Sequence, residues 1–171
     1  MLIDHCYSCV SKAYNDAYSL FKHGQYEKSI VIFKKLYENK CPTSPYFLGV
    51  YSAYGIGIEQ SYGEAIQYFN KFLNEENIAQ PRHYRAHSYY VLSEIYKATK
   101  EIDISFDYLV KAAKLGYDKA FFVLGYSYIS QDSPYYFKKN FKEAFYWLNK
   151  SACLGDAKAM QLIHKHSLQN I

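Results

Sequence analysis

Residues 105–125 read SFDYLVKAAKLGYDKAFFVLG, and the spacing of small and large apolar residues in this stretch decides the fold. Up to Lys114 the apolar residues recur every three or four positions, which is the period of a helix with one buried face. Gly116 is typical of a residue that ends a helix, and a second apolar run with the dipeptide Leu124-Gly125 follows at once. The stretch therefore predicts two consecutive helices joined by a tight turn.

The same arrangement recurs four times along the chain. Each second helix opens on a small residue with an aromatic residue or leucine four positions later, and these pairs are Ser29/Phe33, Ala65/Phe69, Ser105/Leu109 and Ala144/Leu148. Each first helix has a small residue at the matching place, namely Ala17, Gly49, Ser93 and Gly125, with separations of 32, 44 and 32 (49−17, 93−49, 125−93). A period in the low thirties is typical of helix-turn-helix repeats, and the longer step contains an insertion around residues 74–81.

Two helices approach closely only where their side chains are small, so we expect the two small residues of each repeat to face one another. The predicted helices are 3–22, 25–38, 43–55, 61–75, 81–98, 102–115, 117–130, 139–154 and 156–168. The predicted fold is all-α, a right-handed α-α superhelix (solenoid) of about four helix-turn-helix repeats with a C-terminal capping helix. We expect a single domain, 1–171, with repeats at about 8–40, 41–78, 81–116 and 117–155 and the cap at 156–171.

Several of these segments resemble known repeat motifs. GQYEKSI (24–30) resembles the middle of a tetratricopeptide repeat. KAAKLG (111–116) followed by Ala120, and KSACLG (150–155) followed by Ala159, are similar to the signature of Sel-one-like repeats. The chain thus resembles the Sel-one-like repeat family of the tetratricopeptide-like superfamily, which implies a protein-binding scaffold. It departs from the family pattern in the turn of the third copy and in a longer loop, 131–140, in the fourth.

Composition excludes several other classes. Hydrophobic residues make up 50% of the chain and charged residues 21%, which excludes a long disordered chain. No apolar stretch reaches the roughly 18–20 residues of a membrane span, and no signal peptide is visible, so we expect a cytoplasmic protein with no membrane partner. The net charge is +4, but only two of the basic residues are arginines, Arg82 and Arg85, and the chain has no basic tail. These features disfavour nucleic-acid binding.

No metal, cofactor or catalytic site is expected. Cys6 and Cys9 have the spacing of half a zinc site, beside His5, but no second pair of ligands exists. His83 and His87 are also spaced as two metal ligands, without a third nearby. No phosphate-binding loop or nucleophile motif occurs, so we predict that the chain is not an enzyme. An enzyme built on a helical frame is the less favoured alternative.

The predicted function is a protein–protein interaction module with a tyrosine-rich concave groove formed by the first helices. An aromatic residue lies three positions before each small residue, and one position after it the residue type varies. The predicted partner-binding residues are Tyr14, Tyr46, Tyr90 and Phe122, then Tyr18, Val50, Glu94 and Tyr126, with Tyr54 and Lys97 a turn further on. The alternative is that the aromatic row packs one repeat on the next, because a shift of one residue in the helix register turns it inward.

The partner is expected to be another protein. A compact repeat protein without a signal peptide, an enzyme domain or a membrane span is consistent with an immunity protein that neutralises a secreted toxin. A regulatory or host-directed adaptor scaffold fits the same features, and the sequence leaves both interpretations open.

Overall fold

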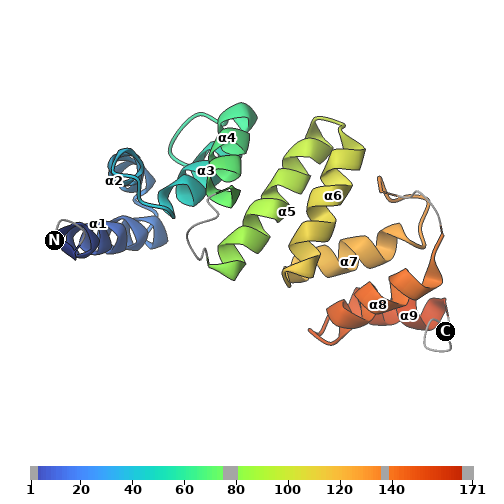
Figure 1. Cartoon of the computed structure of the whole chain (residues 1–171). Coiled ribbons are helices and arrows are strands. Elements are labelled where there is room, and N and C mark those ends of the chain that lie inside the picture. Colours follow the sequence, from blue (N-terminus) through green and yellow to red (C-terminus); the bar gives the residue numbers. More distant parts are fainter. Residues whose placement is uncertain (1–3, 75–80, 136–138, 167–171) are drawn as a thin grey trace. The chain divides into compact units, whose positions relative to one another are not determined.

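A computed structural model of the chain describes residues 4–74, 81–135 and 139–166, with side chains from Lys12 onward (Figure 1). These residues form nine α-helices and no strand. The helices are α1 Asp4–Lys22, α2 Tyr26–Glu38, α3 Ser44–Tyr54, α4 Tyr62–Leu73, α5 Arg82–Ala98, α6 Ile102–Lys114, α7 Asp118–Ser127, α8 Phe141–Ala152 and α9 Ala157–Lys165. Each matches an expected range to within a few residues, and α7 ends at Ser127 rather than at 130.

The chain forms two compact units, Met1–Gln80 (unit 1) and Pro81–Ile171 (unit 2). Unit 1 holds the hairpins α1–α2 and α3–α4, and unit 2 holds α5–α6 and α7–α8 followed by α9. The boundary lies between the second and third predicted repeats.

The two units repeat one design with an offset of 76 residues (93−17). The matching positions are Ala17 with Ser93, Gly24 with Lys100, Lys40 with Gly116, and Gly49 with Gly125. Gly24 and Lys100 both have a left-handed backbone, with φ of 73° and 66°, and each directly precedes the N-cap of a second helix. Since L-residues rarely adopt this conformation, its occurrence at Lys100 indicates that the turn itself demands it.

The predicted contact between small residues is present in the first hairpin of each unit. The Ser29 hydroxyl donates a hydrogen bond to the Ala17 carbonyl oxygen over 2.6 Å. The Ser105 hydroxyl donates in the same way to the Ser93 carbonyl oxygen, also over 2.6 Å. Both serines are fully buried, so each bond joins the two helices of a hairpin inside the core.

In the second hairpin of each unit, a glycine faces a larger residue instead. A Cβ placed on Gly49 would lie 2.9 Å from Cε1 of Phe69, and one on Gly125 would lie 2.5 Å from Cγ of Leu148. Phe69 and Leu148 come one helical turn after the small residues expected at these contacts. The small residue thus admits a large side chain of the facing helix, because the first helix offers no side chain there.

Each buried serine hydroxyl also accepts a hydrogen bond from a tyrosine hydroxyl. Tyr51 on α3 donates to Ser29 Oγ over 2.7 Å, and burial raises the pKa of this tyrosine to about 12. Tyr135 lies 2.8 Å from Ser105 Oγ, whose own proton goes to Ser93, so the Tyr135 hydroxyl is the donor. The position matching Tyr51 in unit 2 is Ser127 (127−51 = 76), whose hydroxyl donates to the Leu124 carbonyl oxygen instead. The loop after α7 therefore supplies the ring that the helix lacks.

Candidate protein-binding face

In unit 1 some of the predicted groove residues are half-buried, one is exposed and two are buried. Tyr14 and Tyr18 are half-buried, with rings stacked at 6.1 Å, and each meets the ring of Phe47 edge-on at 5.9 Å. Tyr54, at the end of α3, is 51% exposed. The half-buried rings therefore pack α1 on α3, and Tyr54 is the most accessible of the predicted tyrosines in this unit.

Tyr46 and Val50 differ from the groove expectation. They are only 9% and 6% exposed, so neither presents a surface to a partner. The Tyr46 ring lies 6.4 Å from Phe69 and 5.6 Å from Phe72, between α3 and its own second helix. Nearly every residue of α3 is buried, because this helix is covered on several sides. At these two positions, packing replaces the predicted groove.

In unit 2 the predicted residues of α5 are partly exposed. The Tyr90 ring is 4.6 Å from that of Tyr117, the residue that precedes α7. One turn further along α5, Lys97 donates to Glu94 Oε1, and these side chains are 36% and 39% exposed. The face of α5 thus combines an aromatic ring held in place by its neighbour with an accessible ion pair.

The predicted residues of α7 form a second aromatic pair. The rings of Phe122 and Tyr126 are stacked at 5.9 Å with an interplanar angle of 8°. Phe122 also packs on the cluster of Ile129, Ala144, Leu148 and Ala159. This second contact fixes the Phe122 ring, while Tyr126 keeps part of its surface in solvent.

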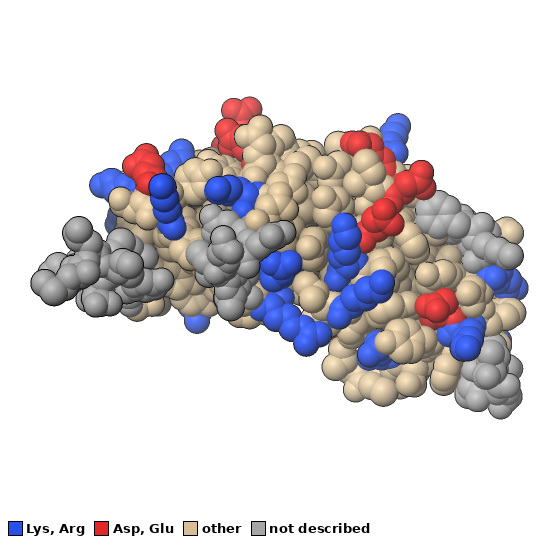
Figure 2. Space-filling view, in the orientation of Figure 1, with Lys and Arg blue, Asp and Glu red and all other residues tan. Residues whose placement is uncertain are grey.

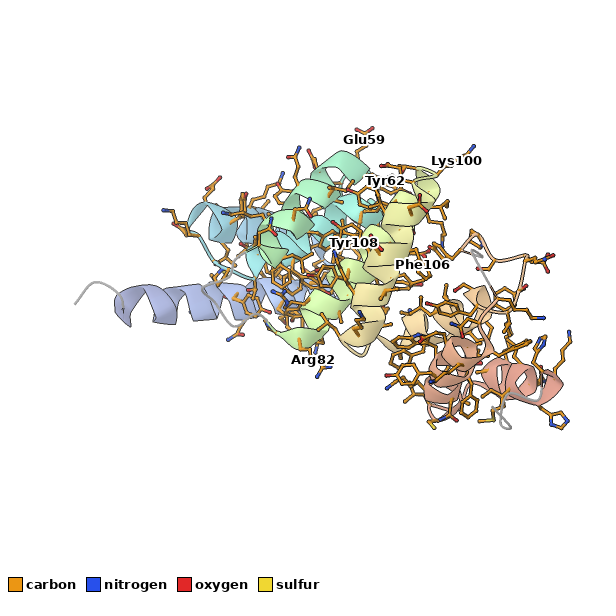
Figure 3. All side chains as sticks on the ribbon, turned by 45° about the vertical axis from the view of Figure 1, so that its right-hand side comes forward. Glu59, Tyr62, Arg82, Lys100, Phe106 and Tyr108 are labelled. Atoms are coloured by element: carbon orange, nitrogen blue, oxygen red, sulfur yellow. The ribbon has the colours of Figure 1, made fainter. Side chains whose placement is uncertain are left out.

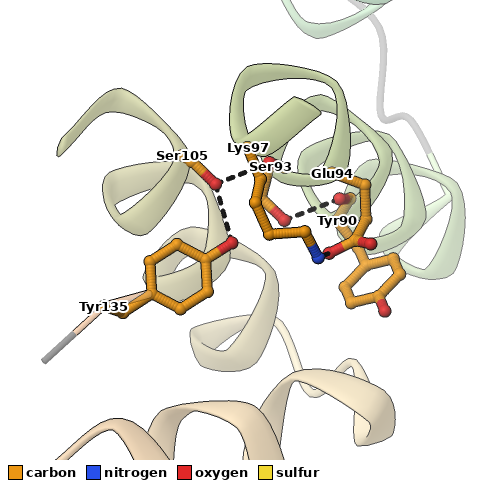
Figure 4. Close-up of polar contacts among 6 residues, drawn as sticks. All are labelled: Tyr90, Ser93, Glu94, Lys97, Ser105 and Tyr135. Carbon is orange, nitrogen blue, oxygen red and sulfur yellow. Dashed lines mark hydrogen bonds and ion pairs between the residues drawn. The ribbon is translucent and has the colours of Figure 1, made fainter. Parts of the chain in front are cut away.

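Buried hydrogen bonds lie close to the ion pair. Ser93 Oγ donates to the Tyr90 carbonyl oxygen over 2.7 Å, next to the bond between Ser105 and Ser93 (Figure 4). The pKa of Tyr135 is raised mainly by burial, and Glu94 raises it further, whereas the bond to Ser105 and the charge of Lys97 lower it. Ser93 directly precedes Glu94 on α5, so these bonds lie beside the ion pair. We call Tyr90, Glu94, Lys97, Tyr117, Phe122 and Tyr126 the α5–α7 face.

Sequence reasoning missed two neighbours of this face. His87 lies one turn before Tyr90, with its ring 5.7 Å from Tyr117, and its pKa falls to about 4 because of burial and the nearby charge of Lys119. The spacing of His87, Tyr90, Glu94 and Lys97 by three, four and three residues is a helical stripe that could have revealed the histidine. Tyr117 stands in a turn, where helix periodicity carries no information.

The described side chains include no group of three or more metal-ligating residues. Cys6, Cys9 and His5 lie outside the described side chains. Cys41 is a buried free thiol in unit 1, and Cys153 is an exposed one in unit 2. Among the described helices, none is long and apolar enough to cross a bilayer.

Comparison with known proteins identifies the repeats. The Sel1 repeat family model matches residues 46–75, 87–117 and 122–156, more than half of the chain. The chain belongs to the Sel1 repeat family. The matches fall in the second, third and fourth predicted repeats. Sel1 repeats generally mediate protein–protein interactions, and the scaffold is typically non-catalytic.

The fold is that of a solved Sel1 repeat protein from Oxalobacter formigenes. The TM-score is 0.69 at 21% sequence identity, over 90% of this chain and 62% of the other. The likeness shows that the Sel1 chain is an all-α helical repeat solenoid, as predicted. With 62% coverage of that protein, the chain spans less than two thirds of its length. No curated protein matches the sequence.

Proposed function

We propose that this Sel1 repeat chain is a non-catalytic binding module that holds a segment of a partner protein on the α5–α7 face. The observation that carries the proposal is that its partly exposed rings are already held by neighbours. Tyr90 lies against Tyr117 at 4.6 Å, and Phe122 lies against Tyr126 at 5.9 Å. Binding to such rings costs little side-chain entropy, which makes them good anchors.

The ion pair supplies the polar part of the same face. Glu94 and Lys97 neutralise each other and both remain more than one third exposed. A partner can therefore replace either member with a charge of its own, which favours a correctly aligned segment over a mismatched one. An aromatic anchor beside an exchangeable ion pair is an arrangement suited to recognition rather than to catalysis.

The proposed face excludes the equivalent strip of unit 1. Tyr14 and Tyr18 pack edge-on against Phe47, and Lys22 Nζ covers the Tyr18 ring at 4.9 Å from its centroid. These rings are engaged in holding α1 on α3. Tyr54 is exposed, but the other predicted residues of unit 1 are either packed between α1 and α3 or buried.

Affinity capture with the 171-residue chain as bait tests this proposal. Truncating an anchoring tyrosine costs ~1–4 kcal/mol of binding free energy, so Tyr90→Ala/Tyr126→Ala should lose a partner that the unmodified chain retains. Tyr37→Ala/Tyr62→Ala is the matched control, because both of these tyrosines are 36% exposed on second helices of unit 1. Equal capture by both variants, with unchanged helical circular dichroism, would show that the partner binds elsewhere.

The identity of the captured protein separates the two finer functions. An immunity protein would retain a toxin and abolish its activity, and an adaptor would retain a regulatory or host protein. Both functions would use the same face, so loss of capture by Tyr90→Ala/Tyr126→Ala is expected in either case.

A further inference from the structure

The starts and ends of helices meet at one edge of unit 2. There α5 begins at Arg82, α6 ends at Lys114 and α7 begins at Asp118, and the short α8–α9 turn lies at the same edge, beside the start of α7. Arg82 Nε donates to the Leu115 carbonyl oxygen over 3.0 Å, which ties the start of α5 to the α6–α7 turn. Figure 3 shows Arg82 at this end of α5 and Lys100 just beyond the opposite end. We call this the turn edge.

The turn edge is rich in positive charge. Its basic residues lie in the first or last turns of the helices that meet there, and they are Arg82, Arg85, Lys111, Lys114, Lys119, Lys150 and Lys158. Unit 2 has thirteen Lys and Arg against eight Asp and Glu, a net charge of +5 (13−8), whereas unit 1 has seven against eight, −1 (7−8). Figure 2 shows basic side chains gathered over the ends of α5 and α6 nearest α7, and acidic ones over the other end of α6.

The carboxylates of the two acidic residues of the edge accept hydrogen bonds at the starts of helices. Asp156 caps α9 by accepting from the Lys158 and Ala159 amides and from Ser151 Oγ. Asp118 accepts from the Lys119 amide in the first turn of α7. These carboxylates stabilise helix N-termini, and the lysine ammonium groups of the edge form no salt bridge with any residue that the structure describes.

Aromatic rings hold two of the lysines in place. Lys111 Nζ lies 4.8 Å from the centroid of Tyr108, on α6 (Figure 3), and 5.9 Å from that of Tyr89. Lys150 lies similarly over Tyr146 and Phe121, at 5.0 and 5.8 Å. A cation over a ring loses side-chain freedom but keeps its charge, so these ammonium groups are positioned to receive an anion.

A shallow hollow of about 290 Å³ lies between the α6–α7 and α8–α9 turns. Its apolar lining includes Phe122 and Leu154, which is 65% exposed, and its charged lining consists of Lys119, Asp118 and Asp156. An exposed leucine beside a ring is a place for an apolar side chain of a binding partner. The edge therefore offers one apolar contact beside Lys119, where the carboxylates of Asp118 and Asp156 are already hydrogen-bonded to backbone amides.

We propose that the turn edge binds an acidic segment of a partner protein, with an apolar side chain in the hollow and carboxylates against Lys111, Lys114 and Lys119. This inference rests on the proposed function, that the chain binds a protein. It extends the α5–α7 face through Phe122, which also lines the hollow, and adds the charge of the ligand. The chemistry favours an acidic peptide over nucleic acid. Lysine is a point charge without the bidentate geometry of arginine. The apolar side chains that line the hollow make no favourable contact with a phosphate.

Fluorescence anisotropy with the 171-residue chain tests the assignment. The probe is a labelled peptide of roughly 12 residues, made of Asp and Glu around one central Leu. We expect binding that weakens as salt rises from about 20 to about 200 mM, since these charges are exposed to screening. Lys111→Gln/Lys114→Gln/Lys119→Gln should weaken binding about 10-fold. Lys28→Gln/Lys34→Gln/Lys35→Gln, three exposed lysines of α2, is the matched control and should change it less than about 2-fold.

Three results would overturn the proposal. The first is equal binding of a peptide with Gln and Asn in place of Glu and Asp. The second is an equal effect of the two triple variants. The third is tighter binding of single-stranded DNA or of phosphatidylserine vesicles than of the peptide. The peptide assay depends on turn-edge lysines and the capture assay on tyrosines of the α5–α7 face, so either proposal can fail while the other stands.

Discussion

Gly125→Ala should destabilise the chain, although alanine is the better helix former. Gly125 lies inside α7, where its backbone approaches α8. The new Cβ would lie 2.5 Å from Cγ of Leu148, 2.9 Å from its Cδ2 and 2.9 Å from its backbone nitrogen. Non-bonded carbon atoms prefer about 3.5–4.0 Å, so the overlap with Cγ is about 1 Å. A rotamer change of Leu148 relieves part of it, but the contact with the backbone nitrogen requires α8 itself to move.

The expected magnitude follows from two opposing terms. Overpacking a tight core contact costs ~1–3 kcal/mol, and a contact with backbone belongs at the upper end of that range. Replacing glycine by alanine in a helix interior stabilises it by about 1 kcal/mol. The net loss in the free energy of unfolding is therefore about 2 kcal/mol, which corresponds to a melting temperature lower by about 4–8 °C.

Urea unfolding followed by far-UV circular dichroism measures this loss, with two other glycines as internal controls. At Gly49 the added Cβ meets only ring atoms of Phe69, at 2.9–3.1 Å, and a ring tilts more easily than a backbone moves. At Gly63 it meets nothing within 4 Å. From least to most stable, the expected order is Gly125→Ala, Gly49→Ala, and then the unmodified chain and Gly63→Ala. A Gly125→Ala variant as stable as the unmodified chain would refute the close packing of α7 on α8.

The buried tyrosines and one histidine give two more predictions. Tyr51→Phe and Tyr135→Phe should each lower the free energy of unfolding by about 1 kcal/mol in urea, because each removes a buried hydrogen bond, whereas Tyr37→Phe at the surface should not. No loss in Tyr135→Phe would mean that the loop ring does not take over the role of Tyr51. The pKa of His87 is about 4 in the folded chain and 6.5 as a free side chain, so the unfolded state gains its proton first. Stability should therefore fall by up to roughly 3 kcal/mol as the pH drops from 6.5 to 4, and His87→Gln should reduce that slope. An identical slope in His87→Gln would assign the acid sensitivity to other groups.

The helices and their pairing were predictable from the sequence because they depend on neighbours within a few turns. Small residues such as Ser29, Ser93 and Ser105 mark where helices cross, and their spacing predicted the hairpins that the structure contains. The stripe of Tyr90, Glu94 and Lys97 was also predictable, since residues three or four apart share one face of a helix. Local periodicity thus determined the elements and the residues that share a helix face.

Only the tertiary structure decided which faces stay in solvent. Tyr46 and Tyr90 hold equivalent places in their repeats, yet Tyr46 is covered by Phe69 and Phe72 while Tyr90 remains partly exposed. Burial depends on which neighbouring helix covers a position, and a periodic pattern does not contain that information. Tyr135 illustrates the same limit, because a loop residue fills a site that Tyr51 fills from a helix. The basic residues of the turn edge are spread from Arg82 to Lys158 along the chain, and they meet only because antiparallel helices return their ends to one edge.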